Sequence, residues 1–249
     1  MLKRASVQEN AARKQRLKDR AGLRVYIDKV QERVTRFGGY CSWKISQDIG
    51  LMRITRNNAM KLAGESQRGV CLAFCAQWII SLSKGQYIRD LLCDSSGEVI
   101  PNKVRQLVIQ HLTLTDMSPA SIVGAPRYQK GQINGELAVQ LYLSQKGLKA
   151  VSLENFHSPG SFAVGLPEKI ISFDSNKGYF LMITLKDDYG SGHAVCAQIA
   201  NKITFFDPGF GEFAFDNKNK FKTWFCEFLL NLTDYSEKYT RYSVFSFIR

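Results

Sequence analysis

The sequence lacks any uninterrupted apolar run of about 18 residues, which a membrane-spanning helix needs. Its first twenty residues, MLKRASVQENAARKQRLKDR, also lack the apolar core of a secretory signal peptide. Leu2 excludes the N-terminal myristoylation pattern. We therefore expect the protein to be made in the cytoplasm without a Sec-type signal peptide and to fold in a reducing environment.

Cysteine and histidine are scarce, with six and three residues among 249. No Cys-x-x-Cys pair occurs, and Cys71 and Cys75, one helical turn apart, have no further Cys or His close in sequence to complete a zinc site. Disulfide frameworks belong to short secreted chains. We expect neither a metal site nor a disulfide framework, and we interpret Cys75, Cys93, Cys196 and Cys226 as buried structural residues.

Positive charge is abundant, with a formal net charge of +12. Residues 1–36 hold eleven Lys or Arg and only four Asp or Glu. We interpret residues 1–35 as a basic, flexible extension that could contact an anionic membrane, and residues 36–249 as the main folded domain. A basic binding module without enzyme activity is an alternative, but no nucleic-acid motif occurs and aromatic residues do not interleave with the basic arm.

The hydrophobic pattern is mostly helical before residue 149 and mostly strand-like after it. Helices are predicted over residues 71–84, 102–112, 135–148 and 218–232, and the last of these is amphipathic. Short runs rich in β-branched and aromatic residues predict strands at 149–156, 178–186, 193–200, 202–207 and 241–248. Helices followed by antiparallel strands indicate an α+β fold.

Cys71 stands at the predicted start of the most apolar helix, after Gly69 and Val70. Unpaired N–H groups at a helix N-terminus favour a thiolate, and the backbone N–H of the first turn can help to hold an oxyanion. Cys71 is therefore the candidate nucleophile.

A nucleophilic thiol needs a base, and His193 is the best of the three histidines. It begins an apolar strand after a glycine-flanked turn, whereas His111 lies within a helix and His157 in a turn. The next strand ends at Asp207, so a hairpin would bring Asp207 to the same end of the sheet as His193. A carboxylate there could orient the imidazole.

The segments GVCLAFCAQWI, GHAVCAQ and FFDPGFGEF resemble the three signature blocks of the YopT/AvrPphB-type effector cysteine proteases, in the papain-like clan. That family keeps Gly-x-Cys with a Trp seven residues on, then Gly-His-Ala, then Asp-Pro-x-x-Gly. The resemblance runs from Ser66 to about Phe215. It implies a papain-like fold, in which N-terminal helices pack on a C-terminal antiparallel sheet.

The resemblance also implies roles for individual residues. Cys71 would be the nucleophile, His193 the general base and then acid, and Asp207 the group that orients it. The family places an oxyanion-hole side chain shortly before the cysteine, which suggests Gln67, with Ser66 as the rival. Glu65, at the offset found in papain, cannot donate a hydrogen bond. This chemistry requires no cofactor.

Two classes of enzyme use such a triad. The resemblance favours an endopeptidase that cleaves a host protein, such as a small GTPase or a kinase, after secretion into the host cell. A transglutaminase, deamidase or fatty acyltransferase would also proceed through a thioester, and sequence alone does not separate these activities.

Overall fold

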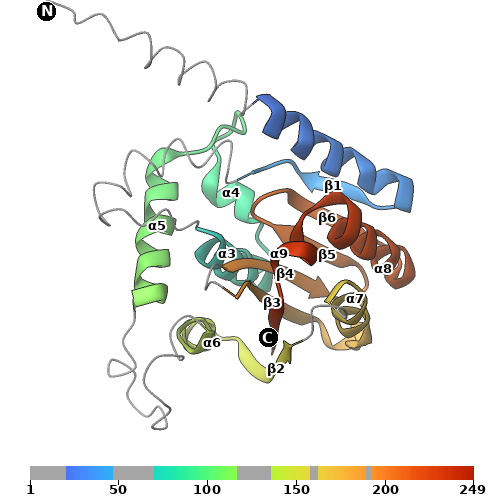
Figure 1. Ribbon diagram of the computed structural model, residues 1–249. Coiled ribbons are helices and arrows are strands. Elements are labelled where there is room, and N and C mark those ends of the chain that lie inside the picture. The colour runs from blue at the N-terminus through green and yellow to red at the C-terminus, as the bar shows by residue number, and fades with distance from the viewer. Residues whose placement is uncertain (1–20, 47–69, 117–135, 158–161, 189–191) are drawn as a thin grey trace, which may run out of the picture.

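The computed structural model describes residues 21–46, 70–116, 136–157, 162–188 and 192–249. Within these ranges one antiparallel sheet has the strand order β1-β6-β5-β4-β3-β7-β2 (Figure 1). The strands are β1 (Tyr40–Trp43), β2 (Lys149–His157), β3 (Tyr179–Lys186), β4 (Gly192–Ile199), β5 (Ile203–Asp207), β6 (Gly211–Phe215) and β7 (Arg241–Ile248). Helices combined with this sheet confirm the predicted α+β class.

The helices lie on both faces of the sheet (Figure 1). They are α3 (Cys71–Ser83), α4 (Ile88–Leu92), α5 (Pro101–Asp116), α6 (Glu136–Gln145), α7 (Phe162–Ser172), α8 (Lys218–Glu227) and α9 (Tyr235–Lys238). Residues 21–33 are also helical. Shorter turns of helix are η1 (Val34–Phe37), η4 (Ser175–Lys177) and the π-helical η5 (Phe228–Leu232). No helix in the described ranges is both long enough and apolar enough to cross a membrane.

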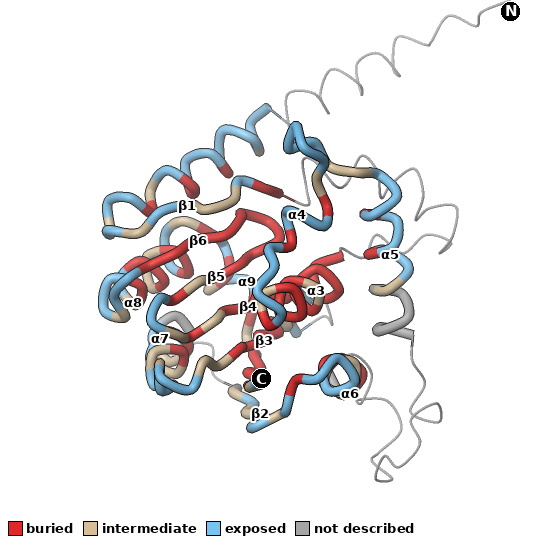
Figure 2. The backbone as a smooth tube through the Cα atoms, turned by 180° about the vertical axis from the view of Figure 1, so that it is seen from behind, coloured by how far each residue is buried: buried red, intermediate tan, exposed pale blue. Residues whose placement is uncertain are grey.

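The first face of the sheet carries α3, which packs between the central strands and the helices α5 and α6. Side chains alternate along a strand, so Ala194 and Cys196 of β4 face α3. Trp78 and Phe206 stack there with ring centroids 5.8 Å apart. Because α3 is enclosed on several sides, nearly all of it is buried (Figure 2), which explains why its sequence is apolar without a polar stripe.

The second face carries α7, α8, η5, α9 and the helix at residues 21–33. Val195 and Ala197 of β4 point to this side, where Phe205 packs on the aromatic rings of α8. Trp224 is fully buried in this cluster. The sheet is therefore a middle layer with an apolar core on each face.

Helix 21–33 differs from the flexible extension that we expected over residues 1–35. Ile27 and Val30 of this helix, and Val34 just after it, are almost completely buried in the second core. Gln31 also donates a hydrogen bond of 2.7 Å to the carbonyl of Phe210. The described part of the basic segment is thus packed on the domain, because its apolar residues recur at helical spacing.

Candidate active site

Cys71 is the first residue of α3, as the sequence predicted. The N-cap residue, Val70, makes no side-chain capping hydrogen bond to the N–H groups of the first turn. The helix is 13 residues long, and its dipole favours negative charge at this end. Cys71 is buried, with 8% of the residue exposed.

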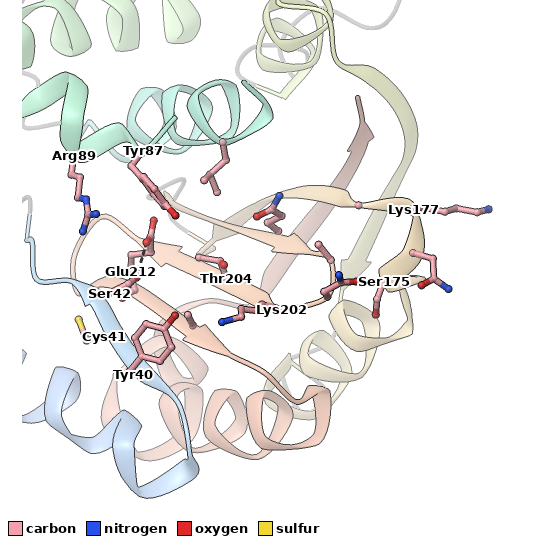
Figure 3. A pocket seen from close by; sticks show the side chains of 17 residues that line it. Tyr40, Cys41, Ser42, Tyr87, Arg89, Ser175, Lys177, Lys202, Thr204 and Glu212 are labelled. Carbon is pink, nitrogen blue, oxygen red and sulfur yellow. Dashed lines mark hydrogen bonds between the residues drawn. The ribbon is translucent and has the colours of Figure 1, made fainter. Parts of the chain in front are cut away.

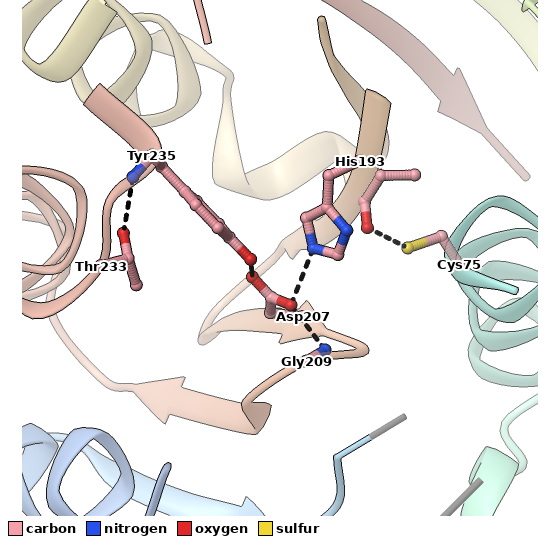
Figure 4. Close-up of polar contacts among 7 residues, drawn as sticks. Cys75, His193, Asp207, Gly209, Thr233 and Tyr235 are labelled. Carbon is pink, nitrogen blue, oxygen red and sulfur yellow. Dashed lines mark hydrogen bonds and ion pairs between the residues drawn. The ribbon is translucent and has the colours of Figure 1, made fainter. Parts of the chain in front are cut away.

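His193 and Asp207 are in direct contact, although their strands do not pair them directly. The β4–β5 register places Cys196 opposite Phe206, so Asp207 lies diagonal to His193 rather than across from it. Even so, His193 Nε2 is 3.0 Å from Asp207 Oδ1 (Figure 4). A carboxylate only accepts, so Nε2 carries the proton. The other ring nitrogen, Nδ1, is then available to accept a proton from a thiol.

Asp207 is fully buried, and both of its oxygens accept hydrogen bonds. Oδ1 accepts from His193 and, at 2.7 Å, from the N–H of Gly209. Oδ2 accepts from the hydroxyl of Tyr235 at 2.9 Å (Figure 4). A buried acid is tolerated in a protein interior when it is bonded in this way.

The pKa of His193 is raised well above its ordinary value of 6.5. Burial alone would lower this pKa, because it disfavours the charged ring. The charge and hydrogen bond of Asp207 outweigh burial, and the hydrogen bond and charge interaction of the ring with Cys71 raise the pKa further. The structure therefore brings Cys71, His193 and Asp207 together and favours a protonated imidazole.

Two tyrosines near this group have hydroxyls with raised pKa values. Burial, together with the charges of Cys71 and Asp207, raises the pKa of Tyr239 far above its ordinary value. Tyr26 donates a hydrogen bond of 2.6 Å to the carbonyl of Leu232, and burial raises its pKa as well. Both phenols are therefore neutral donors at physiological pH.

The neighbouring cysteines are suited to structural roles. Cys75 donates to the carbonyl of Ala194 at 3.3 Å, and burial raises its pKa well above the ordinary value. Burial also raises the pKa of Cys196 and brings that of Cys41 to about 11. Protonated thiols of this kind are poor nucleophiles. All six cysteines are free.

A second buried acid, Glu212, lies in β6. Its Oε2 accepts a bond of 2.6 Å from the indole N–H of Trp78, and its Oε1 accepts one of the same length from Ser42. Trp78 is fully buried, and its hydrogen bond to Glu212 links α3 to β6 of the sheet. These bonds help to fix the helix that carries Cys71.

A groove of about 1020 Å³ opens at the end of β4 that is remote from His193 (Figure 3). Arg89, Lys177 and Lys202 line it, together with Glu212. The one cysteine in its wall is Cys41, whose raised pKa makes it unreactive. Neither Cys71 nor His193 is among the residues that line this groove, so it is separate from the candidate site.

The other residues considered in the sequence lie outside the described ranges or away from the candidate site. Gln67, Ser66 and Glu65 lie outside the described residues, so the oxyanion assignment stays a prediction. His111 lies in α5 and His157 at the end of β2, so both are on elements other than those that form the site.

Sequence reasoning missed Tyr235, because it stands 28 residues beyond Asp207 with no recognisable motif. In the described ranges no three His, Cys, Asp or Glu residues cluster as a metal site.

Known proteins are similar to this chain in sequence over the region that contains the site. Residues 164–247, which include His193 and Asp207, match the family model described as Yersinia/Haemophilus virulence surface antigen, a peptidase family. Cysteine protease yopT1 of Yersinia enterocolitica is 28% identical over 217 residues, covering 82% of this chain and 62% of that protein. Cysteine protease YopT of Yersinia pestis is 26% identical over 222 residues with the same coverage. The chain thus spans about three fifths of the length of these relatives.

The fold is similar to that in the crystal structure of the Pseudomonas avirulence protein AvrPphB. The TM-score is 0.56 at 14% identity, covering 79% of this chain and 94% of that structure. This likeness confirms the predicted papain-like architecture. In sequence and in fold, the chain is therefore similar to the YopT/AvrPphB-type effector cysteine proteases, as the three sequence segments indicated.

Proposed function

We propose that the chain is a cysteine endopeptidase with the triad Cys71, His193 and Asp207. The observation that carries this proposal is the 3.0 Å contact of His193 Nε2 with Asp207, which leaves the opposite ring nitrogen for the Cys71 thiol at the start of α3. A raised His193 pKa supports the same assignment, since it favours an imidazolium beside a thiolate.

In the reaction, Cys71 Sγ attacks the carbonyl carbon of the scissile peptide bond, and the tetrahedral oxyanion is held by the backbone N–H of Cys71. Gln67 is the proposed side-chain donor to the same oxyanion. His193 Nδ1 then gives its proton to the leaving amine, which yields a thioester. A water that loses a proton to His193 hydrolyses this thioester, and the thiol is restored.

We infer from the relatives that the substrate is a host protein, reached after the enzyme is delivered into the host cell. Small GTPases and kinases are the first classes to test. The basic segment at residues 1–35 is proposed to contact anionic membrane. The catalytic domain itself is proposed to span residues 36–249, with helix 21–33 packed on it.

Alkylation by iodoacetamide at pH 6, followed by intact-protein and peptide mass spectrometry, tests the triad. An unpaired thiol with a pKa of about 8.5 is scarcely ionised at this pH. We expect one rapid adduct on Cys71 in the wild type and loss of that adduct in His193→Ala. Cys75→Ala is the matched control, and it should label like the wild type. Slow labelling spread over several cysteines, or labelling unaffected by His193→Ala, would refute the triad.

The class of reaction is tested separately with host-cell lysate, comparing wild type with Cys71→Ala. New protein N-termini that depend on Cys71 support an endopeptidase. A cross-link or an added mass without cleavage would instead indicate an acyl or amide transferase, which uses the same thioester.

A further inference from the structure

The Asp207 carboxylate is fixed from both sides. His193 and the N–H of Gly209 occupy Oδ1, while the Tyr235 hydroxyl occupies Oδ2 at 2.9 Å. Rotation of the carboxylate would break a bond on each side. Of these three donors, His193 takes part in the proposed proton transfer and Gly209 belongs to the turn after Asp207. The Tyr235 hydroxyl does neither, so it can be removed without changing the other two.

Tyr235 is itself held rigidly. It begins α9, and its N–H donates to Thr233 Oγ1, whose hydroxyl in turn donates to the carbonyl of Phe228. The ring is 7% exposed and lies edge-on to Phe228, with centroids 5.7 Å apart. Its centroid is also 5.4 Å from the imidazole of His193. A donor packed in this way loses little conformational freedom when its bond forms.

We propose that Tyr235 is a positioning residue of this active site, whose hydroxyl fixes the Asp207 carboxylate in the orientation that aligns His193 with Cys71. This inference rests on the proposed function, because alignment matters only if Cys71 and His193 form the reactive pair. Tyr235 acts through Asp207 and His193 and does not touch the thiol chemistry itself.

The variant Tyr235→Phe removes the hydroxyl and keeps the ring contacts. A hydrogen bond to a charged group corresponds to roughly a tenfold effect or more. At pH 6 only an imidazole-paired thiol is ionised, whereas near pH 9 most unpaired thiols are ionised too. The ratio of the Cys71 alkylation rates at pH 6 and pH 9 therefore reports pairing, while losses of folding or access affect both rates. We expect this ratio to fall about tenfold.

Tyr26→Phe is the matched control. It removes a tyrosine hydroxyl bond to the carbonyl of Leu232, close to the same aromatic cluster, without removing a donor from Asp207. We expect its rate ratio to stay within about twofold of the wild type. The other titratable groups that interact with His193 or Asp207 are unchanged in both variants; they are Cys71, Cys75, Cys196 and Tyr239.

A double-mutant cycle distinguishes positioning from general stabilisation. In an Asp207→Ala background, the hydroxyl of Tyr235 has lost its acceptor, so Tyr235→Phe should no longer change the ratio. An unchanged ratio in the single Tyr235→Phe variant would overturn the proposal, as would a tenfold fall that persists without Asp207. If wild-type Cys71 itself failed to label at pH 6, the proposed function would fall and this inference with it.

Discussion

Two buried acids flank the turn that joins β5 to β6, and each has a donor for both of its oxygens. Asp207 accepts from His193, Gly209 and Tyr235. Glu212 accepts from Trp78 and Ser42. A charged group in the interior is stable only with such partners. The turn between these acids therefore has little freedom to move, and this limits the side chains that it can accept.

Gly211, in the Asp-Pro-x-x-Gly motif, is the most constrained position in this turn. Its φ is +118°, and a Cβ there would lie 2.6 Å from the carbonyl oxygen of Trp43 in β1. Backbone strain and this contact would act together. We expect Gly211→Ala to lower the free energy of unfolding by about 3 kcal/mol, measured by urea denaturation.

Gly178 provides the matched control for this substitution. It also has a positive φ, of +64°, but a Cβ there would meet nothing within 4 Å. Gly178→Ala should cost only about 1–2 kcal/mol, the strain of a left-handed conformation alone. Equal losses in the two variants would show that the close approach to Trp43 is unimportant.

At the scale of elements, the β4–β5 hairpin was the most predictable part of the site. Its strands are rich in β-branched and aromatic residues, and the short connection between them predicts that they pair as an antiparallel hairpin. His193 and Asp207 were therefore expected at one end of the sheet, and their contact confirms this. Cys71 was predictable for a similar reason, since an apolar run after Gly69 marks a helix start.

Other elements could not be predicted because their signals are weak or lie far apart in the chain. Helix α7 was missed because Pro167 lies inside it, and proline usually ends a helix. Tyr235 reaches Asp207 from a separate helix after β6 and α8, so only the tertiary fold brings them together. Helix 21–33 was expected to be flexible because its charges obscure a short apolar stripe.

That apolar stripe supports a prediction about helix 21–33. Val30 is 1% exposed and belongs to the second core, whereas Val25 on the same helix is 54% exposed. Val30→Ala should lower the free energy of unfolding by about 2–3 kcal/mol, because it leaves a cavity. Val25→Ala should be neutral within about 0.5 kcal/mol, since alanine favours helix and no packing is lost. Similar unfolding midpoints for the two variants would contradict the packing of this helix.

At the scale of the whole molecule, the site combines contributions from both faces of the sheet. Cys71 comes from α3 on the first face, while Tyr235 comes from α9 on the second. His193 and Asp207 belong to the sheet between them. The cluster of Cys71, His193 and Asp207 therefore forms only when both layers have folded, and the protonation of His193 is linked to global unfolding.

This linkage gives a pH dependence with a definite sign. The pKa of His193 is raised well above 6.5 in the folded protein, and in the unfolded chain it returns to about 6.5. Between these values the folded state holds a proton that the unfolded state has released. The stabilisation is fully present below about pH 6.5 and is lost as pH rises through the folded pKa, at up to about 1.4 kcal/mol per pH unit.

Urea denaturation at pH 6 and pH 8.5, in a Cys71→Ala background that removes the titration of this thiol, measures the effect. His193→Gln is the comparison, because its amide can still donate to the buried Asp207. Raised pKa values of buried thiols such as Cys196 also decrease stability at high pH, but they are common to both proteins and cancel in the difference. We expect the protein with His193 to lose on the order of 1–2 kcal/mol more than the glutamine variant between the two pH values. Equal losses would mean that Asp207 does not hold a proton on His193, and the imidazolium would then have to be stabilised mainly by the Cys71 thiolate.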